Sequence, residues 1–222
     1  MFNLKDKILK VIPDNIDIGF YLYDSYTKKS VSINGDIMFP IASITKFIIP
    51  AILLKEEFDI CHEDVINCIS KHSKKSYNTL ISKCTVKEIN TMLQDLSINI
   101  KVAKDNSDVI RNIGSPKSLV DFLKFIFDEE NLNIEYRDLL FNSLCSQSDN
   151  DGFRFFEKGI WAHMTGGLEG VCNDLGILKL EDRKLYIVGL LITKDPSITW
   201  EVQEILLCRI GRIIKEIYAE VH

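Results

Sequence analysis

Apolar residues recur along the chain with two spacings, and each spacing predicts one kind of element. Residues 16–23 and 30–33 are rich in aromatic and β-branched side chains and are separated by turn-forming residues, which predicts a β-hairpin. Residues 159–165, 172–180 and 185–193 predict three more strands. We therefore expect two strands near the N-terminus and three near the C-terminus.

The other apolar segments have helical spacing or are too long and continuously apolar for a strand. Thr85 is a candidate N-cap with Glu88 as its capping-box partner, and Pro116 suits the first position of a helix. Residues 98–114 are polar and irregular, which predicts a loop. The expected helices cover residues 4–11, 39–54, 64–72, 78–84, 85–96, 115–126, 136–145 and 198–221.

This order of elements predicts an α+β fold, in which a five-stranded antiparallel sheet is flanked by the two terminal helices and carries an all-helical insertion. A chain of 222 residues is long enough for one domain of two lobes. We expect an α/β lobe from residues 1–40 and 153–222 and an all-α lobe from residues 41–152. A cleft between lobes is a usual place for a ligand.

Composition narrows the possible partners. The net charge is -5 and basic residues are mixed with acidic ones, so we expect neither a nucleic-acid partner nor an anionic membrane surface. No segment approaches the ~20 apolar residues of a membrane span. Lysines interrupt residues 1–12, which therefore lack the apolar stretch of a secretory signal. Provided that no leader has been removed, we expect a cytoplasmic protein whose six cysteines are reduced. The oligomeric state is not indicated.

Ser43 and Lys46 are the first candidates for chemistry. Residues three apart on a helix share a face, so the hydroxyl and the amine would meet. A serine hydroxyl needs a neighbouring base to become a good nucleophile, and a lysine can serve if burial disfavours its charged form. The apolar residues on both sides of this pair supply that burial.

Two further motifs follow in the chain, Ser76-Tyr77-Asn78 and His163-Met164-Thr165-Gly166-Gly167. With Ser43-Ile-Thr-Lys46, and in this order, they resemble the motifs of the class A β-lactamases and the related penicillin-binding proteins. The resemblance covers almost the whole chain. It extends to the segments 39–43, 112–116, 164–170 and 173–176.

The resemblance implies a role for each matching residue. Ser43 would be the acylated nucleophile, Lys46 its base, and Ser76 the hydroxyl that passes a proton to the leaving group. Asn78 would hydrogen-bond the substrate amide, and Thr165 would offer it a hydroxyl. Gly166 and Gly167 would let the strand edge approach the substrate, and the backbone N–H groups of Ser43 and Gly167 would form an oxyanion hole. No metal and no organic cofactor is implied.

The chain departs from the family pattern at several points. Met164 stands where the third motif normally has a lysine, and a thioether cannot hold a substrate carboxylate. His163 should point to the opposite face of its strand, unless a shift of register brings it into the site. No Glu occurs between Glu88 and Glu129, so the loop lacks the carboxylate that activates the deacylating water in class A enzymes.

Two alternatives concern residues outside the motifs. Asp105 and Asp108 are the only carboxylates in the predicted loop and are either substitutes for the missing Glu or solvated loop acids. The cysteines and histidines of residues 61–84 could suggest a metal site, but their spacing fits no standard zinc pattern. The separation of Ser43 from Ser76 is also shorter than in the β-lactamases.

We therefore expect a serine acyl-transfer enzyme acting on a small-molecule or peptide-like acyl substrate. Its acyl-enzyme on Ser43 would form from an amide, ester or β-lactam carbonyl and would then be hydrolysed or transferred. Two alternatives remain open: an intracellular acyltransferase or peptidase-like enzyme without β-lactamase activity, and an inactive binding protein that retains the fold.

Overall fold

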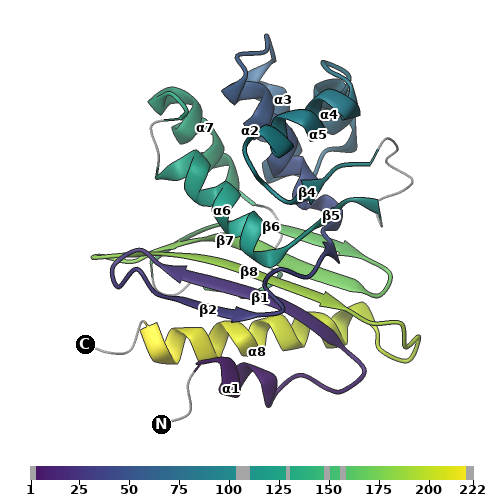
Figure 1. The fold of residues 1–222 in the computed structure, drawn as a ribbon, viewed down its shortest axis with the longest axis vertical. Coiled ribbons are helices and arrows are strands. Elements are labelled where there is room, and N and C mark those ends of the chain that lie inside the picture. The colour runs from purple at the N-terminus through teal and green to yellow at the C-terminus, as the bar shows by residue number, and fades with distance from the viewer. Residues whose placement is uncertain (1–3, 104–110, 129–130, 148–150, 156–158, 219–222) are drawn as a thin grey trace.

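A five-stranded antiparallel sheet forms the middle layer of the molecule in the computed structural model (Figure 1). The strand order is β2-β1-β8-β7-β6, so β6 lies at one edge. The structure describes residues 4–103, 111–128, 131–147, 151–155 and 159–218. The strands of this sheet are β1 (Asp17–Asp24), β2 (Ser30–Ile33), β6 (Ile160–Leu168), β7 (Val171–Lys179) and β8 (Lys184–Ile192). The α+β class and the five predicted strands are confirmed.

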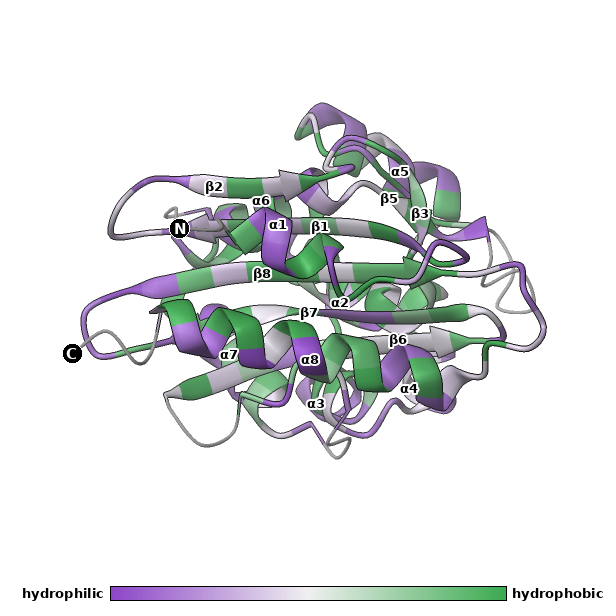
Figure 2. Cartoon of the chain, turned by 90° about the horizontal axis from the view of Figure 1, so that it is seen from below, coloured by the Kyte–Doolittle hydropathy of each residue, from purple (hydrophilic) through white to green (hydrophobic). Residues whose placement is uncertain are grey.

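Helices cover both faces of the sheet (Figure 1). α1 and α8 lie across one face, and Figure 2 shows this layer from below. The other helices lie on the opposite face. The helices are α1 (Leu4–Leu9), α2 (Thr45–Lys55), α3 (His62–Ser70), α4 (Lys74–Ile81), α5 (Val86–Asp95), α6 (Pro116–Phe127), α7 (Ile134–Cys145) and α8 (Trp200–Tyr218).

The sheet is apolar on both faces because two separate cores form against it. In β8, Tyr186 and Val188 belong to the core that includes α2 and α6, whereas Leu185 and Ile187 belong to the core that includes α1 and α8. Successive side chains of a strand point to opposite faces. Burial on both faces therefore explains why these strands read as continuous apolar runs instead of alternating patterns.

Each predicted helix is present, with shifted ends. The Thr85–Glu88 capping box is confirmed at the start of α5, and Ser115 caps α6 ahead of Pro116. The sequence predicts that the last helix continues to residue 221. It is described as far as Tyr218, and residues 219–222 lie outside the described residues.

The predicted helix over residues 39–54 begins later than expected. Phe39–Pro40 forms a short strand, β3, and Ala42–Ile44 forms a 3-10 turn, η1, before α2 starts. A residue that precedes proline avoids the helical region, which excludes Phe39 from the helix. The pairing of β3 with β5 and the φ of 48° at Ala42 then delay the start of α2 to Thr45.

The predicted loop over residues 98–114 also contains short strands. β4 (Ile100–Lys101) and β5 (Ile113–Gly114) pair with each other, and β5 also pairs with β3. Strands of two residues are too short to produce a hydrophobic period, so the sequence did not reveal them. Asp105 and Asp108 lie outside the described residues.

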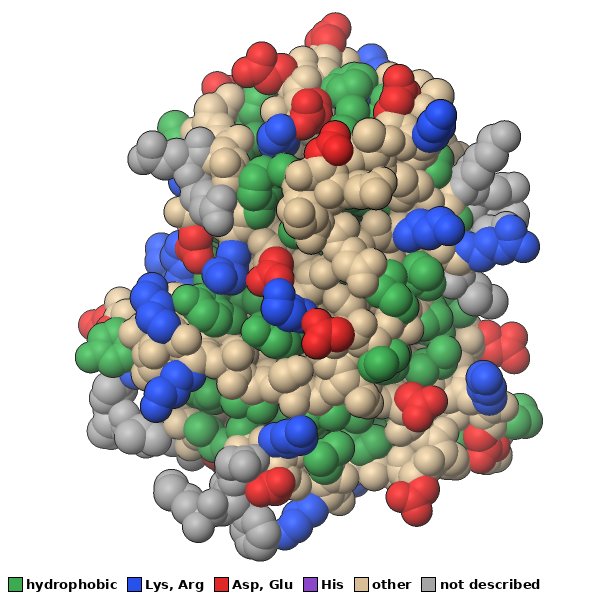
Figure 3. Space-filling view, in the orientation of Figure 1, with side chains coloured by type: hydrophobic (Ala, Val, Ile, Leu, Met, Phe, Trp, Pro, Cys, Tyr) green, Lys and Arg blue, Asp and Glu red, His purple; other side chains and the backbone are tan. Residues whose placement is uncertain are grey.

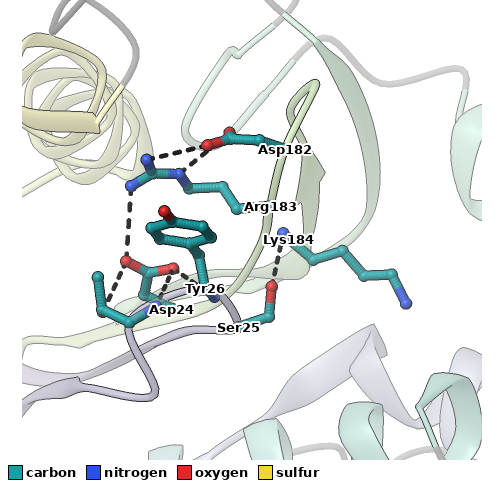
Figure 4. A network of polar contacts seen from close by, with 7 residues as sticks. Asp24, Ser25, Tyr26, Asp182, Arg183 and Lys184 are labelled. Carbon is teal, nitrogen blue, oxygen red and sulfur yellow. Dashed lines mark hydrogen bonds and ion pairs between the residues drawn. The ribbon is translucent and has the colours of Figure 1, made fainter.

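A polar network joins the turn after β1 to the turn between β7 and β8 (Figure 4). The buried carboxylate of Asp24 accepts a hydrogen bond from the backbone N–H of Tyr26 at 2.9 Å, and Arg183 Nη1 lies 3.6 Å from the same carboxylate. The backbone N–H of Lys184 donates to Ser25 Oγ at 2.8 Å. These contacts fix the end of the sheet remote from any predicted site residue.

The surface shows no large area of one charge on the face in Figure 3, where acidic and basic side chains are mixed. Among the described residues, no helix has both the length and the apolar character that a membrane span requires. All six cysteines are described, and each has a free thiol.

Candidate active site

A cavity of about 1020 Å³ opens beside the edge strand β6. Its lining comes from η1, from the turn between α3 and α4, from β6 and from the start of α8. The residues that matter to its chemistry are Ser43, His72, Thr165, Gly166, Gly167 and Trp200.

Ser43 sits in η1, where the backbone is held on two sides. The N–H of Ile41 donates to the carbonyl of Asn112 at 2.8 Å, and Asn173 Nδ2 donates to the carbonyl of Pro40 at 2.9 Å. Ala42, directly before the serine, has a φ of 48°, a region that residues with a Cβ rarely occupy. Such a conformation costs about 1–3 kcal/mol and persists only where the surroundings enforce it.

Lys46 meets the serine across one turn. Its Nζ lies 3.3 Å from Ser43 Oγ, and both side chains are half-buried. Cys68 packs behind this pair and donates its Sγ–H to the carbonyl of Lys46 at 3.4 Å. Burial raises the pKa of the Cys68 thiol to about 12, so this neighbour stays neutral and places no negative charge beside the amine.

Gly166 allows β6 to approach the backbone of Ser43 closely. A Cβ at this position would lie 2.7 Å from the carbonyl oxygen of Ile41 and 3.2 Å from the backbone nitrogen of Ser43. Those neighbours are backbone atoms and cannot move aside easily, so only glycine fits. At Gly167 a Cβ would instead meet the indole of Trp200, at 2.8 Å from Nε1.

The structure does not bring Ser76 and Asn78 to the cavity. Ser76 is buried on α4, and its backbone N–H donates to the capping oxygen of Ser73. Asn78 is exposed on the same helix. Among the described residues that line the cavity, His72 is present but neither Ser76 nor Asn78 is.

His72 is the residue that sequence reasoning did not place in the site. It lies between α3 and α4 with a φ of 51°, and its Nε2 is 3.0 Å from Gln147 Oε1 and 3.5 Å from Thr165 Oγ1. No local signal marks it, because a turn residue with positive φ is typically Gly or Asn and the contacts come from segments far away in the chain.

Met164 and His163 point to opposite faces of β6, as predicted. Met164 is buried in the core on the α2 side, with its Sδ 2.9 Å from Gln147 Nε2. His163 stacks on Trp161 and lies 3.0 Å from a carboxylate oxygen of Asp174. The regular pairing of β6 with β7 from Ile160 to Leu168 excludes the alternative of a shifted register.

The His163–Asp174 pair is fully buried on the α8 side of the sheet, away from Ser43. Burial raises the pKa of Asp174, while the attraction of His163 and hydrogen bonds from the backbone of Phe153 and Leu175 oppose this change. The pair therefore connects β6 to β7 behind the cavity.

The cavity lining is more acidic than basic. The hydrogen bonds of Ser197 to Asp195 and of Thr199 to Glu201 lower the pKa of each carboxyl, so both are ionised at neutral pH. Among the described lining residues the acidic side chains are Asp151, Glu169, Asp195 and Glu201, whereas Lys194 is the only lysine or arginine. Within the described part of the chain, no three His, Cys, Asp or Glu side chains are grouped so that they could hold a metal ion.

Comparison with known proteins identifies a family and a set of solved structures with the same fold. The profile of the beta-lactamase enzyme family matches residues 70–219, a range that begins after Ser43 and Lys46. No curated protein matches the chain in sequence.

Several solved structures have the same fold. The structure of PBP-A is 18% identical, with a TM-score of 0.87 over 100% of this chain and 97% of that one. A mutant of PBP-A, solved as an acyl-enzyme complex with penicillin G, has the same identity and TM-score over 99% of this chain and 97% of that one. A class A beta-lactamase from Mycobacterium abscessus is 18% identical, with a TM-score of 0.86 over 98% of this chain and 100% of that one.

Proposed function

The chain belongs to the beta-lactamase enzyme family, a family of serine hydrolases, and from this premise we propose that it forms an acyl-enzyme on Ser43. The observation that carries the proposal is the 3.3 Å contact between Lys46 Nζ and Ser43 Oγ beside a glycine-edged strand. A hydroxyl with a neighbouring amine, facing a cavity, is what nucleophilic acyl transfer requires.

The proposed reaction begins when Lys46 accepts the proton of Ser43. Ser43 Oγ then attacks a carbonyl carbon, and the resulting oxyanion is stabilised by the backbone N–H groups of Ser43 and Gly167. Donors of this kind act on charge that develops only in the transition state. The leaving group departs with a proton, and the acyl group remains on Ser43 as an ester.

The preferred substrate is uncharged or cationic near the scissile bond. A buried thioether stands at Met164, where a cation would hold a substrate carboxylate, and acidic side chains outnumber Lys194 around the cavity. Their field repels anions and attracts amines. This favours small esters or amides, or peptide-like acyl donors, over β-lactams that carry a carboxylate.

The acyl-enzyme is expected to be long-lived. The sequence between Glu88 and Glu129 contains no Glu to activate water, so hydrolysis lacks the base that class A enzymes use. A persistent acyl-enzyme in an acidic cavity suits transfer of the acyl group to an amine. This observation favours an acyltransferase as the second candidate function.

Intact-mass spectrometry tests the proposal directly. The protein is incubated with an uncharged nitrophenyl ester and, separately, with penicillin G, alongside Ser43→Ala. We expect a persistent adduct from the ester, slower labelling by penicillin G, and no adduct on Ser43→Ala. A wild-type protein that reacts with neither probe would favour a binding protein that retains the fold, and an adduct of equal yield on Ser43→Ala would contradict the proposed role of Ser43.

A further inference from the structure

We propose that His72 supplies the proton to the leaving group, through the hydroxyl of Thr165. This inference rests on the proposed acyl transfer at Ser43 and adds the group that completes it. It replaces the sequence-based assignment of that role to Ser76.

The first support is position. His72 and Thr165 line the same cavity as Ser43, and the imidazole Nε2 lies 3.5 Å from Thr165 Oγ1. Thr165 directly precedes Gly166, whose α-carbon lies against the backbone of Ser43. A substrate attacked by Ser43 therefore has its leaving group near a hydroxyl that the imidazole contacts. Ser76 is buried on α4 and outside this lining.

The second support is the orientation of the imidazole. Gln147 Nε2 donates to the carbonyl of Ile69 at 3.0 Å, and a carbonyl can only accept, so the amide orientation of Gln147 is fixed. Its Oε1 then faces His72 Nε2 at 3.0 Å and must accept a hydrogen bond from it. Nε2 therefore carries a hydrogen, which Gln147 Oε1 accepts in this structure, and Thr165 Oγ1 lies 3.5 Å from the same nitrogen.

The third support is chemical. Histidine is the side chain whose ordinary pKa, ~6.5, suits proton donation near neutral pH. Asp195 and Glu201, which also line the cavity, have lowered pKa values and are poor acids at that pH. A hydroxyl such as that of Thr165 gives up its proton efficiently only when a second group donates a new proton to the same oxygen.

The proton inventory balances without any further reactant. The Ser43 hydroxyl proton moves to Lys46, the Oγ–C bond forms, and the bond from the carbonyl carbon to the leaving nitrogen breaks. That nitrogen takes the Thr165 hydroxyl proton, and the imidazolium of His72 breaks its Nε2–H hydrogen bond to Gln147 Oε1 and gives that proton to Thr165 Oγ1, 3.5 Å from Nε2. His72 ends neutral and Lys46 ends charged, and exchange of one proton with water at each residue restores both.

The test compares His72→Gln with wild type on two acyl donors that share one acyl group. An amide has a leaving group that must be protonated, whereas a nitrophenyl ester has one that needs no proton. General acid catalysis contributes about 10²–10⁴-fold, so we expect the amide acylation rate to fall by on the order of 10²-fold or more and the ester rate to change by less than about 5-fold. His62→Gln, an exposed histidine at the start of α3, is the matched control.

Thr165 provides a second arm that does not depend on His72→Gln folding. Thr165→Ser keeps the hydroxyl and should retain amide acylation, whereas Thr165→Val should show the same leaving-group-dependent loss as His72→Gln. Equal losses on both donors, or no loss on either, overturn the proposal for His72. An ester adduct that also forms on Ser43→Ala would instead overturn the proposed function, so the two failures are distinguishable.

Discussion

At the scale of single residues, the site depends on backbone geometry as much as on reactive side chains. Ala42 adopts a positive φ immediately before Ser43, and Asn173 and Asn112 hold the segment that leads to it. Ser43 is thereby turned toward Lys46 and the cavity. Gly166 completes the arrangement by leaving room for the strand edge.

Replacement of Lys46 tests the assignment of the base. We expect Lys46→Ala to lower the rate of Ser43 acylation by about 10²–10⁴-fold, because the hydroxyl loses the amine that lies 3.3 Å away. The rate is measured by intact mass against time with the nitrophenyl ester. Lys55→Ala at the end of the same helix is the control and should acylate like wild type. Comparable rates for both variants would remove Lys46 from the mechanism.

Replacement of Gly166 tests the close approach of β6. In Gly166→Ala the added methyl would lie 2.7 Å from the Ile41 carbonyl oxygen, so the strand must move away from Ser43. Overpacking of this kind costs about 1–3 kcal/mol, and we expect lower stability together with slower acylation. Gly167→Ala should cost less stability, since its methyl meets the side chain of Trp200 instead of backbone. Urea denaturation compares the two, and an unaffected Gly166→Ala contradicts the packing argument.

At the scale of elements, turns and helix ends place the functional groups. The turn between α3 and α4 brings His72 to the cavity, and α7 ends at Cys145 shortly before Gln147, which contacts that imidazole. β3 pairs with β5 over two residues, and this pairing fixes the extended segment that directly precedes η1. Each of these elements is short, so neighbouring layers must hold it in place.

The cap of α5 is a local feature whose energetics can be measured apart from the site. Thr85 Oγ1 accepts from the Glu88 N–H, and Thr85→Ala should lower Tm by roughly 2–4 °C without changing acylation. Hydrogen bonds from Thr85 lower the pKa of Glu88. The stabilisation that this cap gives the folded state is therefore present at pH values above the ordinary pKa of a glutamate, and it is lost as the pH falls through the folded-state pKa.

The difference in Tm between wild type and Thr85→Ala should therefore be largest near neutral pH and should shrink in acid. Thr91→Ala is the matched control, because Thr91 lies exposed within the same helix and donates only to the carbonyl of Lys87. A difference between wild type and Thr85→Ala that grows as pH falls would contradict the assigned direction.

At the scale of the whole molecule, one sheet with two apolar faces connects the site to the rest of the structure. β6 and β7 carry Gly166 and Asn173 on the cavity side, and the same two strands carry the buried His163–Asp174 pair behind it. The stability of this sheet edge and the geometry around Ser43 are therefore coupled.

Removal of one partner of the buried pair should be strongly destabilising. Asp174→Ala leaves His163 and the Phe153 N–H without their acceptor, which costs about 3–5 kcal/mol in the free energy of unfolding. Asp182→Ala, at the exposed turn after β7, should stay within about 0.5 kcal/mol of wild type. Urea titrations measure both, and an Asp174→Ala protein as stable as wild type would show that the pair contributes little.

The sequence by itself determined the five strands, the helices and the Ser43–Lys46 pairing, because these features depend on neighbours within one turn or one strand. It also determined the opposite facing of His163 and Met164, since side chains alternate along any strand. It did not determine the short strands β3, β4 and β5, which exist only because distant segments pair.

Only the tertiary structure decided which side chains line the cavity. Ser76 matched a motif by letter but faces the interior from α4, whereas His72 matched no motif and lines the cavity because a turn with positive φ places it beside Thr165 and Gln147. Those partners are 93 and 75 residues away along the chain. Contacts over such separations are set by how layers pack, and no local pattern encodes them.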